Sequence, residues 1–443
     1  MATGFKVGAG KIEIKLSAGL PMAGYAARSG MATGNHDPLF ARMVIFDCNM
    51  KQHALVVLDL LKVDRHLVAL IRKEINSVTG ILPNSITVAA THTHSGPSGI
   101  WDGYDNYNPA LVTSMVATIA NLAREVWAKR VPAKIGIKTG EVHNLGRNRN
   151  DPVGSYDPEV GVIRIDSLDG RALALIVNYA CHPTVLGESN LLFSRDFPGY
   201  ALDMIEKESP GGAPVAVFIN GAAGDISTRY TRKEQTCEEA KRFGELLAEK
   251  VLSISKELAS SSDWEIDSYN MELLLPVRRI SRGSATKMLA DAYRKLSDFE
   301  YAQADQGRIR EAKTTVQAAE IVLNRLANEI YQDLPKNLPA EIQMIYLTGI
   351  STRAVLIVLP GEISSGISQQ IKEIIHQVGG LEKKHIMILG YGNGYIGYLL
   401  SPDSYQELKY DSIMSKFDSE ATELVVKAIR TLGLKGCEKN AGK

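Results

Sequence analysis

The sequence lacks an excess of charge of either sign. Its 443 residues include 50 Lys and Arg and 50 Asp and Glu, so the formal net charge is zero when the histidines are neutral. Proteins that attract nucleic acids or anionic membranes through general electrostatics carry a clear excess of positive charge. We therefore expect no nucleic-acid partner.

Cysteine is also scarce, and long apolar runs are absent. The four cysteines are spread over the chain with no CxxC spacing, so we expect neither a disulfide framework nor a structural zinc cage. No apolar run approaches the roughly 20 residues needed to cross a bilayer, and the N-terminus shows no secretion signal. We expect a cytoplasmic protein without a transmembrane segment.

Five short apolar segments are each followed directly by a polar or glycine-rich loop. The segments are 86–90, 172–180, 215–219, 354–359 and 386–389. Such runs predict strands that are buried on both faces. Helical spacings lie between them, which favours an α/β architecture. Functional groups in such sheets gather beyond the carboxyl ends of the strands, so we expect the five loops to converge.

The predicted fold is α/β, with a central mixed β-sheet flanked by helices in one domain over residues 1–435 and a short tail at 436–443. The spacing of Ile413, Phe417, Leu424 and Ala428 predicts a last helix that ends near Leu434.

Residues 283–333, at their approximate bounds, predict an inserted helical hairpin with a break near 304–307. We expect this hairpin to cover one side of the domain or to mediate self-association into a homo-oligomer. The simpler interpretation is a solvated excursion with no part in catalysis, because its polar faces are rich in Lys, Arg, Glu and Gln.

Two histidines in one loop are the first candidate metal ligands. His92 and His94 follow the segment 86–90, and in an extended segment residues i and i+2 project to the same side. One or both could instead be structural histidines at a strand end. His182 also follows a predicted strand, and Pro183 favours an extended backbone at that histidine.

An acidic residue and two tyrosines complete the candidates. Glu362 follows Pro360-Gly361, where a solvated carboxylate would be ordinary and one aimed into a cleft would not. Tyr395 and Tyr398 lie in a glycine-dense loop that permits close backbone approach, although tyrosines there could equally serve packing.

Taken together, these residues resemble the catalytic domain of the neutral/alkaline ceramidase family. The resemblance extends from about residue 5 to residue 430, and the family's full-length enzymes carry a further C-terminal β-sandwich domain that we do not expect in this chain. Family members are zinc hydrolases that cleave the amide of an N-acylated sphingoid base. The segments that carry the resemblance are 7–14, Met22-Ala23-Gly24-Tyr25-Ala26, Thr91-His92-Thr93-His94-Ser95-Gly96-Pro97 and Gly224-Asp225-Ile226-Ser227.

By position, the resemblance implies a zinc ion (Zn2+) held by His92, His182, Glu362 and Tyr398. Tyr398 is preferred over Tyr395 because the family places a second active-site tyrosine twelve residues after the ligand, and Tyr410 meets that spacing. The resemblance also implies that His94 and Arg149 polarise the substrate. Ser227 matches the serine of the family's Gly-Asp-x-Ser-Pro-Asn motif.

The donor types suit this chemistry. Two imidazoles, a carboxylate and a phenol oxygen suit zinc, which lowers the pKa of a bound water toward about 7. We expect His94, Arg149 and the metal to stabilise the oxyanion formed on attack at an amide carbonyl, and His94 or a metal-bound group to protonate the departing nitrogen. Ser227 has no local base and no GxSxG context, so we expect it to orient substrate or water.

Two departures from the family pattern concern the substrate. Thr228-Arg229 replaces Pro-Asn in the serine motif, and residues 98–104 depart from the family's small-residue pattern. We therefore expect a small-molecule or lipid-like amide that is smaller or more soluble than ceramide. The alternatives are a zinc esterase, lactonase or deacetylase on the same site, a non-catalytic ligand-binding protein, and a metal-free serine hydrolase.

Overall fold

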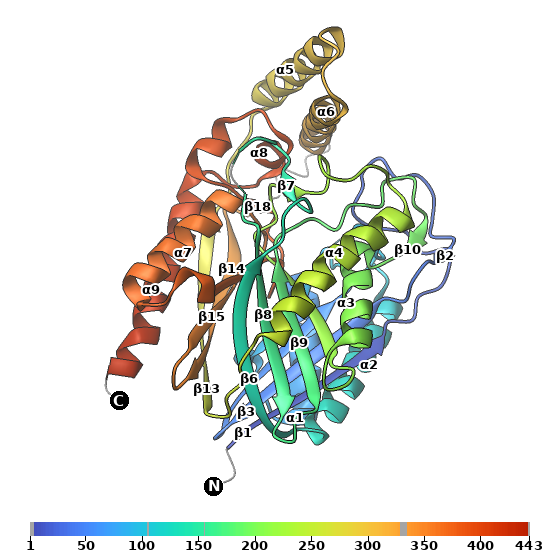
Figure 1. Ribbon diagram of the computed structural model, residues 1–443. Coiled ribbons are helices and arrows are strands. Elements are labelled where there is room, and N and C mark those ends of the chain that lie inside the picture. Colours follow the sequence, from blue (N-terminus) through green and yellow to red (C-terminus); the bar gives the residue numbers. More distant parts are fainter. Residues whose placement is uncertain (1–3, 104–105, 155, 328–334, 442–443) are drawn as a thin grey trace.

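The computed structural model describes residues 4–103, 106–154, 156–327 and 335–441 (Figure 1). Its main sheet has the strand order β11-β9-β8-β6-β1-β3-β4-β5, in which β4 and β5, like β9 and β11, are parallel and the other pairs antiparallel. Its strands are β1 (Phe5–Glu13), β3 (Phe40–Cys48), β4 (Lys51–Leu58), β5 (Ile86–Ala90), β6 (Val131–Glu141), β8 (Glu159–Ser167), β9 (Ala172–Tyr179) and β11 (Val215–Asn220).

A second, smaller sheet packs against the first. Its order is β13-β14-β15-β17, formed by β13 (Trp264–Pro276), β14 (Asn337–Gly349), β15 (Arg353–Val358) and β17 (Ile386–Leu389). Val44 and Ile163 of the main sheet share one buried apolar cluster with Ile345 and Leu356 of the second. The predicted mixed α/β fold is confirmed, but the protein contains two stacked sheets where the prediction placed one central sheet.

Helices cover the outer face of each sheet. The main sheet is covered by α1 (Arg65–Thr79), α2 (Pro109–Ala128), α3 (Asp196–Glu208) and α4 (Cys237–Lys256), and the second by α7 (Ser365–Gly379) and α9 (Ser419–Ala441). Apolar residues at helical spacing face each sheet, as in α1, where Leu67, Ile71 and Ile75 are buried. The result is a helix–sheet–sheet–helix stack (Figure 1).

The five predicted strands are confirmed as β5, β9, β11, β15 and β17. The loops after them meet at one end of the stack, as expected. Short paired segments fix these loops: β16 (Glu362–Ile363) pairs with β18 (Tyr398–Leu399), and β12 (Ile226–Ser227) pairs with β7 (Arg147–Asn148). The shortest remaining elements are β2 (Gly34–Asn35), β10 (Leu192–Phe193) and the 3-10 turns η1 (Pro83–Ser85), η2 (Lys383–His385) and η3 (Pro402–Gln406).

The inserted hairpin is present as α5 (Arg282–Tyr301) and α6 (Gln306–Ala327), with the break where it was expected. Its predicted end at Asp333 lies outside the described residues. The hairpin packs through Ala285 and Val322 on Ile413 of α8 (Tyr410–Met414). Figure 1 shows α5 and α6 beyond the end of the sheets where the loops converge.

The C-terminal helical pattern differs from its prediction. It is divided into α8 and α9, and Phe417 is fully buried in the connection between them. Helix α9 continues to Ala441 instead of ending near Leu434. The four cysteines are free thiols, as expected. Among the described helices, none is long and apolar enough to span a membrane.

Close packing of α3 on α4 gives a test of the fold. A Cβ atom at Gly244 would lie 2.5 Å from the Tyr200 Cβ and 2.7 Å from the Phe197 carbonyl oxygen. Although Ala is the better helix former, we expect Gly244→Ala to lower the free energy of unfolding by about 1–3 kcal/mol, because the added methyl forces the helices apart. Urea denaturation measures this change.

Gly283→Ala is the matched control. It lies in the first turn of α5, where the nearest atom to an added Cβ is the Ser281 Oγ at 3.9 Å. We expect this variant to be unchanged or slightly more stable. Equal stability of the two variants would contradict the described contact between α3 and α4.

Candidate active site

His92 reaches the site through a turn, not through an extended strand. It lies two residues beyond β5 with φ at 69°, a left-handed conformation that is costly for any residue except glycine and is typical of functional sites. The prediction that His92 and His94 share one side of an extended segment is therefore wrong, because the backbone is not extended at His92. The two rings still meet, with their Nε2 atoms 3.3 Å apart.

Backbone carbonyls fix the protons of two imidazoles. The His92 Nδ1 lies 2.6 Å from the Leu61 carbonyl oxygen, and the His182 Nδ1 lies 3.0 Å from the Ile226 carbonyl oxygen. A carbonyl oxygen can only accept, so each Nδ1 donates, and in a neutral ring the Nε2 then keeps a lone pair. Metal-binding histidines are oriented in the same way by the hydrogen bond of their other nitrogen.

Both lone pairs face the carboxylate of Glu362. Its Oε2 lies 3.0 Å from the His182 Nε2 and 3.6 Å from the His92 Nε2, and all three side chains are buried. Burial and the Arg149 charge lower the pKa of His182 to about 4, so this imidazole is neutral at neutral pH. When both rings are neutral, their Nε2 lone pairs and the carboxylate oxygen repel one another, and a cation among them would offset that repulsion.

The donor set therefore fits a metal cation. Neutral imidazoles and a carboxylate are common zinc ligands. Several buried polar atoms around the centre also have no hydrogen-bond partner within the described residues, namely the His94 Nδ1, the Arg149 Nε and the Tyr391 hydroxyl. Unpartnered buried polar atoms are rare in native proteins and indicate where a ligand, ion or water binds.

His94 belongs to the same cluster. The ligand atoms of His92, His94 and His182 lie within 4.8 Å of one another. A Cβ atom at Gly24, whose φ is 107°, would lie 2.7 Å from the His94 Cα, so the segment 22–26 can pass this histidine only with glycine there. The neighbouring Tyr25 ring packs on the His94 ring at 5.0 Å between centroids. His94 is thus held beside the centre and also lines the cavity described below.

Arg149 is fixed by an acidic residue that the sequence did not reveal. Its guanidinium forms a buried ion pair with Asp411, while its Nη2 donates to the Tyr398 hydroxyl at 3.2 Å and its Nη1 lies 3.4 Å from the His182 Nε2. Asn150 donates to the other Asp411 oxygen at 2.6 Å. Burial opposes the charge, but Asp411 outweighs it and the pKa of Arg149 is raised. Asp411 directly follows Tyr410, which was the only available signal.

Three tyrosines besides Tyr410 surround Glu362. Tyr395 donates to the Glu362 Oε1, and Tyr391 stacks on the His92 ring at 4.0 Å between centroids. Tyr398 lies beside Glu362 in the β16–β18 pair and contacts Arg149. Tyr398, the tyrosine that the resemblance implies as a ligand, thus lies next to the centre. The direct hydrogen bond to Glu362 is made by Tyr395 instead. The assignment of Tyr398 as a ligand stays a prediction.

Tyr410 and Ser227 complete the predicted set. The Tyr410 ring meets the Tyr398 ring edge-on at 6.0 Å, and burial raises the pKa of Tyr410 to about 12, so its hydroxyl is protonated at neutral pH. The Ser227 Oγ accepts the Arg229 N–H at 3.3 Å, and no described residue contacts that oxygen as a base. The eight predicted site residues are therefore brought together at one end of the stack.

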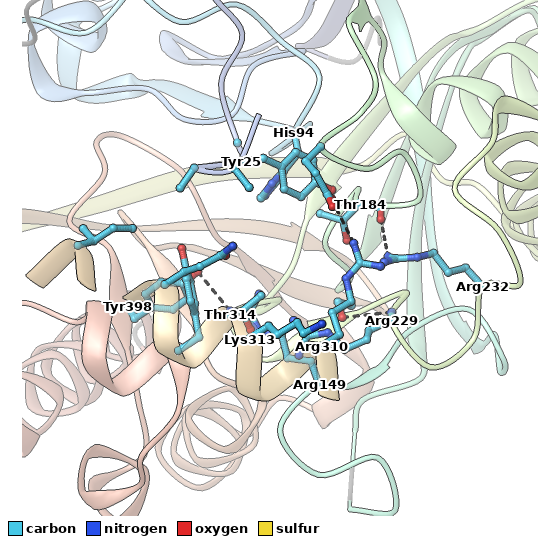
Figure 2. A pocket seen from close by; sticks show the side chains of 18 residues that line it. Tyr25, His94, Arg149, Thr184, Arg229, Arg232, Arg310, Lys313, Thr314 and Tyr398 are labelled. Carbon is cyan, nitrogen blue, oxygen red and sulfur yellow. Dashed lines mark hydrogen bonds and ion pairs between the residues drawn. The ribbon is translucent and has the colours of Figure 1, made fainter. Parts of the chain in front are cut away.

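A cavity of about 230 Å³ opens beside His94, Arg149, Ser227, Tyr398 and Tyr410 (Figure 2). One of its walls comes from the inserted hairpin. The hairpin thus borders the cavity, because α6 contributes lining side chains, and its having no part in catalysis stays a prediction. These are Arg310, Lys313, Thr314, Gln317 and Ile321.

The sequence is similar to one family model and to several curated proteins, and all of those described here are ceramidases. Residues 5–251 match the family model described as neutral/alkaline non-lysosomal ceramidase, N-terminal. The neutral ceramidase of Mycobacterium tuberculosis is 23% identical over 390 residues, and the match covers 73% of this chain and 59% of that protein. Neutral ceramidase B of Dictyostelium discoideum is also 23% identical, with 93% of this chain and 70% of that protein covered.

A solved structure shows the same fold. The crystal structure of neutral ceramidase from Pseudomonas aeruginosa matches with a TM-score of 0.76 at 18% identity, covering 99% of this chain and 75% of that one. The mixed α/β arrangement of the chain is therefore one found in a solved protein.

Metal content tests the centre. We expect purified protein to bind about one zinc ion per chain and His92→Ala to lose it, because the variant removes one of the two oriented nitrogen lone pairs. Ser227→Ala and His143→Ala, the latter at an exposed histidine, should keep the metal. Inductively coupled plasma mass spectrometry measures the content. Equal zinc in His92→Ala and wild type would contradict this site.

Asp411 provides a test of the buried ion pair. Asp411→Asn leaves the Arg149 charge buried without its counter-ion, and we expect the free energy of unfolding to fall by about 3–5 kcal/mol. Asp305→Asn removes an exposed pair with Arg308 and should cost less than about 1 kcal/mol. Urea denaturation compares them, and similar small losses in both variants would refute the described role of Asp411.

Proposed function

Since the chain belongs to the neutral/alkaline non-lysosomal ceramidase family, we propose that it is a zinc-dependent hydrolase that cleaves the amide bond of an N-acyl substrate. The observation that supports this most is that the buried Nε2 atoms of His92 and His182 meet the Glu362 carboxylate beside a cavity.

His92, His182 and Glu362 would hold the ion, with Tyr398 as the proposed fourth ligand. A zinc ion bound there supplies Lewis acidity, which makes water nucleophilic at neutral pH and offsets negative charge on the substrate. The short β16–β18 pair and the two backbone carbonyls at Leu61 and Ile226 hold these side chains before any substrate arrives.

Arg149 and His94 would act on the scissile carbonyl. Both line the cavity. Asp411 holds the Arg149 guanidinium in place, and the Arg149 Nε has no hydrogen-bond partner among the described residues. Fixed donors aimed at a developing oxyanion are typically worth about 10²- to 10³-fold in rate each. The Arg149 guanidinium is therefore proposed to stabilise negative charge that develops on the carbonyl oxygen.

A proton must also reach the leaving nitrogen. His94 is the proposed carrier, because its buried Nδ1 has no hydrogen-bond partner in the described part of the chain and the ring borders both the centre and the cavity. Ser227 would orient substrate or water, since no described base contacts its hydroxyl. A serine nucleophile would need such a base.

The substrate is proposed to be smaller or more soluble than ceramide. The cavity measures about 230 Å³, and its aliphatic lining is limited to Ala26, Ala27 and Ile321. A cavity of this volume can enclose only a short hydrocarbon chain, so a long chain would bury little of its surface there. A small-molecule or short lipid-like amide fits better.

Release of amine from N-acyl amides of graded chain length tests this function. We expect the zinc-loaded protein to cleave short-chain amides, chelation to abolish cleavage and added zinc to restore it. His94→Ala and Arg149→Gln should each lower kcat about 10²- to 10³-fold while zinc content is kept, and His143→Ala should match wild type.

Two results would contradict the proposal. Cleavage that persists after complete zinc removal would point to a metal-free mechanism. A protein that holds one zinc per chain but cleaves neither amides nor esters would favour a non-catalytic ligand-binding role.

A further inference from the structure

The cavity has a second cluster of functional side chains, away from the proposed metal ligands. Arg229, Arg232 and Arg310 line it together, and Figure 2 shows them on the side of the cavity opposite Tyr398. Glu188 is the only carboxylate among the described lining residues. This side of the cavity therefore carries more positive than negative charge, in a chain whose overall formal charge is zero.

Two of the three guanidiniums are held in place by neighbours. The Arg232 Nη1 donates to the Thr184 carbonyl oxygen at 2.6 Å and to the Thr228 Oγ1 at 2.9 Å. Arg310 of α6 donates to the Gln235 Oε1 at 3.1 Å and lies 3.3 Å from the Glu188 Oε2. Their positions are fixed, yet most of these contacts are with uncharged oxygens.

A buried carboxylate also acts on Arg232 but is occupied elsewhere. Asp196 influences Arg232 electrostatically, while its own oxygens accept the N–H groups of Val185, Leu186 and Phe197. It does not provide a direct ion pair for Arg232 in the described structure.

Arg229 has no side-chain partner within the described residues. It is half-buried, and only its backbone N–H forms a hydrogen bond, to Ser227. Burial and the nearby Arg149 lower the pKa of Arg229 to about 10, so it still carries its charge at neutral pH. A half-buried guanidinium without a counter-ion costs free energy that a bound anion would recover.

The like charges also oppose one another. Burial is the main cause that lowers the pKa of Arg232 and of Arg229, and the nearby positive charges of Arg310 and Arg149, respectively, lower them further. Arg310 forms an ion pair with Glu188, but Arg229 and Arg232 have no direct carboxylate partner among the described residues, so ion pairs that join α6 to the rest of the protein do not account for the whole cluster. Planar guanidiniums that converge on open space instead match the bidentate geometry of oxyanions.

We propose that Arg229, Arg232 and Arg310 form an anion subsite, and that the substrate is an N-acyl amide carrying a carboxylate, sulfonate or phosphate group. That the bound anion is part of a substrate rests on the proposed function. Binding of an anion by the three arginines does not require hydrolysis. Thr228 and Arg229 stand where the family's serine motif has Pro and Asn. The subsite therefore depends on residues that depart from that motif.

Binding of uncleavable ligands tests the subsite without turnover. N-(hexylsulfonyl)glycine carries a carboxylate, and its primary amide is the uncharged match; the sulfonamide replaces the scissile amide in both. Isothermal titration calorimetry on the zinc-loaded full chain should show the carboxylate binding at least about tenfold more tightly than the amide. Analogues that end in sulfonate or phosphate identify which oxyanion the subsite prefers.

Variants assign the preference to these arginines. Arg229→Gln and Arg310→Gln should each reduce the affinity for the carboxylate about tenfold and leave the affinity for the primary amide unchanged. Arg308→Gln is the matched control, because Arg308 lies two residues from Arg310 on α6, is exposed and does not line the cavity. Arg229→Lys, which keeps the charge, should retain part of the preference.

Several results separate this inference from the proposed function. Equal affinity for the charged and uncharged ligands, or equal losses in Arg308→Gln and Arg310→Gln, would overturn the subsite even if neutral amides are cleaved. A carboxylate preference that disappears in Arg229→Gln, in a protein that cleaves no amide, would support the subsite and contradict the hydrolase. Thermal unfolding midpoints near that of wild type confirm that the variants are folded.

Discussion

Two backbone carbonyl oxygens set the orientation of the two histidines at the centre of this protein. By accepting the Nδ1 protons of His92 and His182, Leu61 and Ile226 turn both Nε2 lone pairs toward the Glu362 carboxylate. That arrangement is unfavourable without a cation and favourable with one. The converging strand ends, the left-handed backbone at His92 and the short β16–β18 pair all serve to hold these three side chains together.

The site divides into parts with different origins. The proposed metal ligands and Arg149 come from loops that follow strands, so the stacked sheets fix their positions. The opposite wall comes from the inserted hairpin, which packs on α8 beside Tyr410. Loops and insertions can change while a sheet scaffold stays the same. Of the proposed anion subsite, Arg310 lies on the hairpin, whereas Arg229 and Arg232 lie in the loop that follows Ser227. The proposed anion preference therefore depends on both parts of the chain.

The sequence predicted the five strands that lead into the site because each is a short apolar run with an abrupt end, such as Ile86–Ala90. It did not predict β13, whose residues are mostly half-buried and whose apolar run is confined to Leu273–Leu275 near its end, so the second sheet was missed. The roles of Glu362 and Tyr398 came from resemblance, since neither stands out by type or spacing alone.

Other features depended on tertiary structure that no local pattern encodes. Asp411 meets Arg149 from a position 262 residues away in the chain. The cavity wall on α6 looked like a solvated helix face, because charged residues such as Arg310 have the same composition whether they face water or a cavity. The left-handed turn at His92 replaced the expected extended segment and still brought the imidazoles together.

The most direct test of the account is an anomalous difference map at the zinc absorption edge from crystals of the zinc-loaded protein. The account predicts one strong peak per chain, placed among the His92 Nε2, the His182 Nε2 and a Glu362 carboxylate oxygen. A peak elsewhere, or no peak while these three atoms keep their present separations, would contradict it.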